Sequence, residues 1–143
     1  MKTILVPVDF SDVTTAVLSA AQTLAQAFGS KIILLHVSEP EPDFVGFEPG
    51  PQTVRMSVAR DLHAEHRQLE ELKQTLLVDS LALHIQGPMA EKILLQAAEH
   101  SADLIVMGSH GHGALYELLV GSVTSSVLKS AACPVLVVPA RRS

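Results

Sequence analysis

Hydrophobic positions along the chain fall into two kinds of run. Short, almost continuously apolar runs rich in β-branched residues are typical of strands buried on both faces of a parallel sheet. Such runs occur at residues 3–8, 31–37, 104–107 and 134–138. Stripes with a period near 3.6 residues are typical of amphipathic helices. These occur at residues 13–28, 53–76, 88–100 and 122–131.

A fifth strand is predicted between the second and third helical stripes. Leu81, Leu83 and Ile85 alternate with small or polar residues, so we expect a half-exposed strand at an edge of the sheet. Gly29 is expected to close the first helix, and Ser11 to cap its start. Pro88 lies near the first position of the third helix, where proline is well tolerated.

The alternation of strands and helices predicts one α/β architecture. It is an open, five-stranded, mainly parallel sheet with helices on both faces and right-handed crossovers. With a strand order of 3-2-1-4-5, the order reverses between the strand at 3–8 and the strand at 104–107. Ligands of such sheets bind beyond the carboxyl ends of the strands at that reversal. Asp9 and Gly108 would then meet there, although they lie far apart in the sequence.

Residues 38–52 interrupt this alternation with a long loop. Four carboxylates alternate with prolines and glycines there, at Glu39, Glu41, Asp43 and Glu48. These carboxylates either approach the metal of a bound ligand or simply keep the loop solvated, and we favour the second. A loop of this length is commonly functional or partly disordered.

Composition narrows the class of protein. The chain has 143 residues, 48% of them hydrophobic and 3% aromatic, and a net charge of -5. One domain spanning 1–143 is expected at this length. Net negative charge and scarce aromatic residues argue against nucleic-acid binding. The N-terminus resembles neither a signal peptide nor a membrane span, and the single Cys133 suits a reducing compartment, so we expect a cytoplasmic protein without membrane association.

The most informative segment runs from Gly108 to Ser122 and has the spacing G-x2-G-x9-G-S between a strand and a helix. Exposed backbone N–H groups at a strand end and a helix start suit phosphate oxygens. The segment is neither a Walker A loop nor a dinucleotide fingerprint, since no Lys follows its glycines and their order differs. Without that Lys, the segment is better suited to binding phosphate groups than to catalysing their transfer. An ordinary glycine-rich turn is the alternative.

Other polar residues also allow two interpretations. Asp9 either caps the first helix or accepts hydrogen bonds from ribose hydroxyls, which we favour. His36, His110 and His112 invite a metal hypothesis, but polar lining of a phosphate site is preferred because structural zinc usually takes four ligands. His63 and His66 are expected on a solvated helix face. Cys133 is expected as a free thiol rather than a bridge between subunits.

Taken together, these residues resemble the universal stress protein family, and the resemblance covers the whole chain. It rests on five motifs, at Val6–Ser11, Leu34–Val37, Met107–Gly111, Gly121–Thr124 and Cys133–Val138. The glycine spacing resembles that of the family's ATP-binding branch. The implied fold is Rossmann-like, of the adenine nucleotide alpha hydrolase-like kind.

The resemblance also implies a nucleotide site and an assembly. The implied ligand is ATP, with AMP as an alternative, and Mg²⁺ would bind through the phosphates rather than through protein ligands. A homodimer would pair its last strands, Pro134 to Val138, and a further protein partner is unknown. The implied contacts are Gly108, Gly111, Gly121 and Ser122 to phosphate, Val123 and Thr124 beside them, His112 as polar lining, Asp9 to ribose, Val37 to adenine, and Pro7, Val8 and Met107 as apolar contacts.

The leading hypothesis is therefore an ATP-binding stress or signalling module that is not an enzyme. A slow ATPase or an enzyme that uses ATP is a second possibility. A third is a module that binds AMP or a cyclic nucleotide, or that works without any nucleotide.

Overall fold

The structure is a computed structural model that describes residues 1–38, 51–109 and 120–139, with the backbone alone described for 51–61. Nine elements follow one another along these residues. They are β1 (Thr3–Pro7), α1 (Thr14–Phe28), β2 (Lys31–Ser38), α2 (Pro51–Gln74), β3 (Ser80–Gln86), α3 (Met89–Glu99), β4 (Leu104–Gly108), α4 (Ser122–Ser130) and β5 (Val135–Val138).

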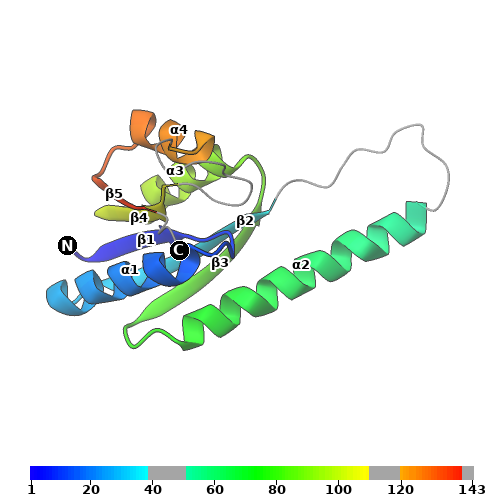
Figure 1. Ribbon diagram of the computed structural model, residues 1–143, viewed down its shortest axis with the longest axis horizontal. Coiled ribbons are helices and arrows are strands. Elements are labelled where there is room, and N and C mark those ends of the chain that lie inside the picture. Colours follow the sequence, from blue (N-terminus) through cyan, green and yellow to red (C-terminus); the bar gives the residue numbers. More distant parts are fainter. Residues whose placement is uncertain (39–50, 110–119, 140–143) are drawn as a thin grey trace.

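The strands form one parallel sheet in the order β3-β2-β1-β4-β5. Helices α1 and α2 lie on one face of the sheet, and α3 and α4 lie on the other (Figure 1). This arrangement confirms the predicted α/β, Rossmann-like fold and its strand order. The position of β3 at an edge is also confirmed, and most of its residues are only partly buried.

The core consists of two apolar layers separated by the sheet. Because successive side chains of a strand point to opposite faces, a strand covered on both faces is apolar at every position. The layer beneath α1 and α2 includes Ile4, Val6, Ile32, Leu34 and Val106 with Val17, Ala21 and Leu69. The layer beneath α3 and α4 includes Leu5, Ile33, Leu35 and Ile105 with Ile93 and Val127.

Helix α1 ends as expected but begins later than expected. Gly29 adopts the left-handed conformation (φ 66°, ψ 33°) and closes the helix. The predicted cap at Ser11 is wrong, because the N-cap is Val13 and no side chain caps the helix. Phe10 has a positive φ of 62°, so the chain makes an extra turn after β1. Ser11 therefore lies ahead of the helix, and its carbonyl accepts the N–H of Thr14 at 3.1 Å.

The segment predicted as a loop at 38–52 is shorter at both ends. Ser38 still belongs to β2, where it pairs with Gln86 of β3. Pro51 already begins α2, which is consistent with the tolerance of proline in the first helical turn. The four loop carboxylates lie outside the described residues.

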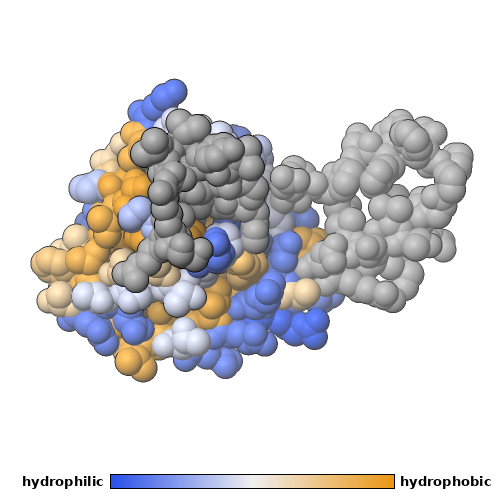
Figure 2. All heavy atoms as spheres, in the orientation of Figure 1, coloured by the Kyte–Doolittle hydropathy of each residue, from blue (hydrophilic) through white to orange (hydrophobic). Residues whose placement is uncertain are grey.

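Apolar side chains are also exposed on part of the surface. Leu128 of α4 and Leu136 of β5 are 46% and 39% exposed. Figure 2 shows apolar residues gathered on the side of the molecule that carries β4 and β5. The other side of β5 has no strand paired with it among the described residues.

Candidate functional site

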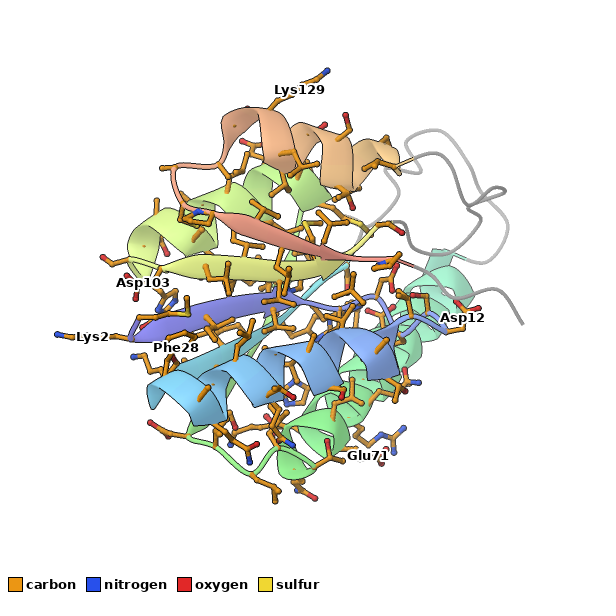
Figure 3. The ribbon with its side chains drawn as sticks, turned by 60° about the vertical axis from the view of Figure 1, so that its left-hand side comes forward. Lys2, Asp12, Phe28, Glu71, Asp103 and Lys129 are labelled. Atoms are coloured by element: carbon orange, nitrogen blue, oxygen red, sulfur yellow. The ribbon has the colours of Figure 1, made fainter. Side chains whose placement is uncertain are left out.

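The candidate site lies where β1 and β4 end side by side. The two strands pair through Ile4 with Leu104 and Leu5 with Ile105. Continued along both strands, this register places the end of β1, just before Asp9, beside the end of β4 at Gly108. From there the chain passes to α1 on one face and to α4 on the other, so this is the predicted reversal of strand order. In Figure 3, Asp12 lies at this end of the sheet, while Lys2 and Asp103 lie at the opposite end.

Hydrogen bonds fix the start of α4 at the end of β4. The N–H of Gly121 donates to the carbonyl of Ser109 at 2.8 Å, and the N–H of Ser109 donates to Val138 at 2.9 Å. The buried hydroxyl of Thr124 donates to the carbonyl of Gly108 at 2.8 Å. These hydrogen bonds join the two ends of the glycine segment.

The first turn of α4 offers backbone donors at this position. Gly121 is the N-cap in an extended conformation (φ -63°, ψ 161°), and no side chain caps the helix. The first intrahelical bond runs from the N–H of Ser125 to Gly121 at 2.9 Å. The N–H groups of Ser122, Val123 and Thr124 therefore have no acceptor within the helix. The N–H of Gly121 itself is engaged with Ser109.

Asp9 lies in the turn that follows β1. Its Oδ1 accepts the N–H of Ser11 at 3.0 Å, a common local turn for aspartate. Asp9 is partly exposed, and it does not cap α1, whose N-cap is Val13. The turn fixes the orientation of the carboxylate, and within the described residues Oδ2 accepts no hydrogen bond.

The apolar residues predicted around adenine do not share one surface. Val8 packs in the layer beneath α1 and α2, whereas Val37 and Met107 pack in the layer beneath α3 and α4. All three side chains are at most 7% exposed. Pro7 is partly buried at the end of β1. The backbones of these residues come together at the strand ends, while the side chains of Val8, Val37 and Met107 pack in the core.

Two of the predicted site residues belong to residues 110–119, which the structure does not describe. Gly111 and His112 lie outside the described residues, as does His110. Their predicted contacts to phosphate stay predictions.

A cluster of polar side chains lies beside the site, on the face covered by α2. His36 of β2 donates from Nδ1 to the carbonyl of Val8 at 2.8 Å, because a carbonyl can only accept. Its Nε2 lies 3.0 Å from Oε2 of Glu65, and Nε2 of His84 lies 3.4 Å from the same oxygen. The Ser38 hydroxyl donates to Glu65 and lies 2.6 Å from Nε2 of His84.

The electrostatics of this cluster favour an ionised Glu65. Burial opposes ionisation, but the hydrogen bond from Ser38 and the charge of His36 outweigh it, so the pKa of Glu65 is lowered. Burial also lowers the pKa of His84, and His36 lowers it further while Glu65 opposes the shift. His84 therefore tends to be neutral near pH 7.

Sequence reasoning placed His36 near the site but missed Glu65 and His84. His36 and His84 are direct partners in the parallel register of β2 and β3. Glu65 precedes the fully buried Leu69 by one helical turn, so it lies on the face of α2 that contacts the sheet. The helical periodicity of α2 was a usable signal for Glu65, whereas the register of β3 was not visible in the sequence.

The fold and the end-of-strand site define an α/β protein of the Rossmann-like kind. Within the described part of the chain, no helix has the length and apolar character needed to cross a membrane. The model of the universal stress protein family matches residues 1–139. The chain belongs to the universal stress protein family.

Individual relatives match over nearly the whole chain. A universal stress protein from Thermus aquaticus is 38% identical, with 96% of this chain and 98% of that protein aligned. The solved structure of protein MJ0577, from Methanocaldococcus jannaschii, has a TM-score of 0.83 and 29% identity. That comparison covers 99% of this chain and 98% of the other.

Two more distant solved structures hold nucleotides. One is a universal stress protein in complex with cAMP, at a TM-score of 0.69 and 22% identity, covering 96% of both chains. The other is a universal stress protein from Archaeoglobus fulgidus in complex with dAMP, at a TM-score of 0.63 and 20% identity. It covers 96% of this chain and 97% of that one. At these identities the two comparisons show a shared fold.

Proposed function

We propose that this chain binds ATP and acts as a nucleotide-dependent module in stress response or signalling. The observation that carries the proposal is the uncapped start of α4 at the carboxyl end of β4. Its first N–H groups have no acceptor within the helix, and a helix N-terminus favours negative charge. These N–H groups lie at the carboxyl ends of the strands, where nucleotide ligands of such folds bind.

Different residues would contact the phosphates, the ribose and the adenine of ATP. The N–H groups of Ser122, Val123 and Thr124 and the Ser122 hydroxyl would bind phosphate oxygens. Asp9 would accept hydrogen bonds from the ribose hydroxyls, and the backbone of Val37 would contact adenine. Gly121, whose N–H is engaged with Ser109, would instead allow close approach of the phosphates. The further predicted contacts are Gly108, Gly111 and His112 to phosphate, and Pro7, Val8 and Met107 along the strand ends.

The charge balance at the site favours binding assisted by Mg²⁺. Residues 7–12, 36–38, 107–109 and 120–124 include no Lys or Arg, and they carry the carboxylates of Asp9 and Asp12. A triphosphate beside these groups needs a cation, which Mg²⁺ bridging the phosphates would supply. The same lack of Lys and Arg leaves no group to stabilise charge on a transferred phosphoryl group, so we propose a binding protein rather than an ATPase.

Adenine nucleotides with one phosphate are the second candidate ligands. They are supported by the complexes of two distant relatives with cAMP and dAMP. Such a ligand would occupy part of the same donors at the start of α4.

We also propose an assembly and a setting for the module. Residues 1–143 would form one cytoplasmic domain, and two copies would pair along β5. The open edge of β5 and the exposed side chain of Leu136 support this pairing.

Ligand-induced stabilisation tests the nucleotide proposal directly. Mg²⁺–ATP should raise the thermal midpoint, since binding to the folded state at 100 times Kd adds about 2.7 kcal/mol. Gly121→Val should lose that rise, because its side chain would occupy the approach of the phosphates. The negative φ of Gly121 lets valine adopt the same backbone. Ser130→Val, at the exposed far end of α4, is the control and should keep the full rise.

Two outcomes would reject the proposal. One is a full thermal shift in Gly121→Val, and the other is no shift in the wild-type protein with ATP, AMP or cAMP. Native mass spectrometry of protein purified without added nucleotide would identify a bound ligand by its mass.

A further inference from the structure

The cluster of His36, Ser38, Glu65 and His84 brings side chains from three elements to one point. His36 and Ser38 come from β2, His84 from β3 and Glu65 from α2. His36 and Ser38 are each 6% exposed, and His84 is largely buried as well. One ligand atom from each of His36, Glu65 and His84 lies within 4.8 Å of the other two. The nucleotide proposal uses none of these four side chains.

A count of protons shows what the cluster requires. Because Nδ1 of His36 carries the proton donated to Val8, Nε2 of the neutral ring has a free lone pair. An ionised carboxylate also only accepts. Two such acceptors 3.0 Å apart repel one another unless a cation lies between them. That cation is either a proton shared by His36 and Glu65 or a metal ion.

We propose that this cluster is a binding site for a divalent transition metal, with Zn²⁺ as the fitting ion. The ligands are Nε2 of His36, Nε2 of His84 and the carboxylate of Glu65. The Ser38 oxygen or a water molecule completes the fourth position. The proposal does not depend on nucleotide binding.

The spacing of the ligand atoms fits this coordination. Zinc bonds to imidazole nitrogen and carboxylate oxygen of about 2.0–2.2 Å place neighbouring ligands of a tetrahedron about 3.3–3.6 Å apart. Nε2 of His36 and Nε2 of His84 lie 3.0 and 3.4 Å from Oε2 of Glu65. The Ser38 oxygen lies closer, 2.6 Å from Nε2 of His84, so it would move outward to bind the ion or leave the fourth position to water. Binding would therefore need only small shifts of the side chains.

The surroundings hold both imidazole rings in place. The bond from Nδ1 of His36 to the Val8 carbonyl selects the tautomer that leaves Nε2 free, and histidine ligands of metals are commonly oriented by such a bond from the other ring nitrogen. The ring of Phe10 packs on His36 with centroids 4.4 Å apart. The ring of His66 stacks on His84 at 6.1 Å and 12°.

The donor set also selects the kind of ion. Two imidazoles and one carboxylate suit Zn²⁺, Co²⁺ or Ni²⁺, whereas Mg²⁺ and Ca²⁺ prefer oxygen ligands. The site is thus chemically distinct from a magnesium ion held by the phosphates of a nucleotide.

Titration of the nucleotide-free protein with Co²⁺ and then Zn²⁺ tests the proposal. Co²⁺ should produce the visible absorption of a four-coordinate ion, and one equivalent of Zn²⁺ should abolish it. Glu65→Gln and His84→Asn should each weaken the affinity for the metal by at least about tenfold, since losing even a group that hydrogen-bonds to a metal ligand costs that much. His63→Asn, on an exposed position of α2, is the matched control and should bind as the wild type does.

The variants avoid the buried His36, whose replacement would endanger the fold, and circular dichroism checks that each variant is folded. Nitrogen-15 NMR of the imidazoles gives an independent readout, because Zn²⁺ should shift Nε2 of both His36 and His84. Unchanged affinity in folded His84→Asn and Glu65→Gln would overturn the proposal. So would a wild-type protein without stoichiometric binding, in which case a proton bridges His36 and Glu65.

Discussion

The carboxylate of Asp103 shows how one side chain sets the start of two strands. It accepts the N–H groups of Lys2 at 2.8 Å and Thr3 at 3.0 Å, just before β4 begins. These two bonds favour the ionised form and lower the pKa of Asp103. In Figure 3, Lys2 and Asp103 lie together at the end of the sheet opposite the candidate site. The contact therefore affects folding without touching the ligand.

This contact predicts a pH-dependent contribution to stability. Because the folded pKa of Asp103 lies below its unfolded value of about 3.9, its stabilisation is fully present above that value. It is lost as the pH falls through the folded pKa, because below that pKa the carboxyl group is protonated in both the folded and the unfolded state. The wild type should exceed Asp103→Asn in free energy of unfolding at neutral pH, and the gap should narrow on acidification. Urea denaturation between about pH 7 and pH 3 measures both.

The difference between the two proteins isolates this carboxyl group, because all other titrating groups are shared. A gap that stays constant across the titration, or that widens on acidification, would contradict the assignment.

At the scale of elements, Gly29 ends α1 by its backbone conformation alone. Its φ of 66° disfavours residues with a Cβ, while the space around a Cβ at this position is open. Gly29→Ala should therefore cost about 1–2 kcal/mol in free energy of unfolding. Gly29→Asn should cost less, because asparagine tolerates the left-handed region. Chemical denaturation of the three proteins should rank them glycine, asparagine, alanine, and an alanine variant as stable as the wild type would refute the argument.

The sequence predicted most elements because local chemistry determines them. Continuous apolar runs marked the buried strands, and alternation marked β3 as an edge. The helix boundaries were less predictable where the cause is not local. The turn at Phe10, with its positive φ, shifted the start of α1 away from Ser11. Pairing with β3 extended β2 through Ser38, and nothing in residues 36–38 alone indicates that.

At the scale of the whole molecule, the sheet order explains what sequence reasoning found and missed of the site. The predicted strand order placed the reversal between β1 and β4, so the sequence indicated that the ends of these two strands lie side by side. The predicted apolar contacts depend on which face of the sheet each strand-end side chain occupies, and this was not visible in the sequence. Val8 and Met107 proved to lie in opposite layers. The cluster around Glu65 depends on the register of β3 and the docking of α2, which only the folded chain defines.

The two edges of the sheet allow a matched test of the proposed dimer. Leu136 of β5 is 39% exposed and Leu81 of β3 is 46% exposed, so each edge strand offers an accessible leucine. A lysine on an edge strand opposes pairing with another chain because its charge would have to be buried. Leu136→Lys should therefore weaken dimerisation, whereas Leu81→Lys should leave it unchanged.

Sedimentation velocity across a concentration series measures both variants against the wild type. The wild type should sediment as a dimer, and Leu136→Lys should shift the dissociation constant upward by at least about tenfold, which corresponds to about 1.4 kcal/mol. Dissociation caused by Leu81→Lys alone would assign the interface to β3 instead. A wild-type protein that stays monomeric at every concentration would exclude pairing along either edge. The comparison decides between the edges because both substitutions add the same charge to the same kind of exposed leucine.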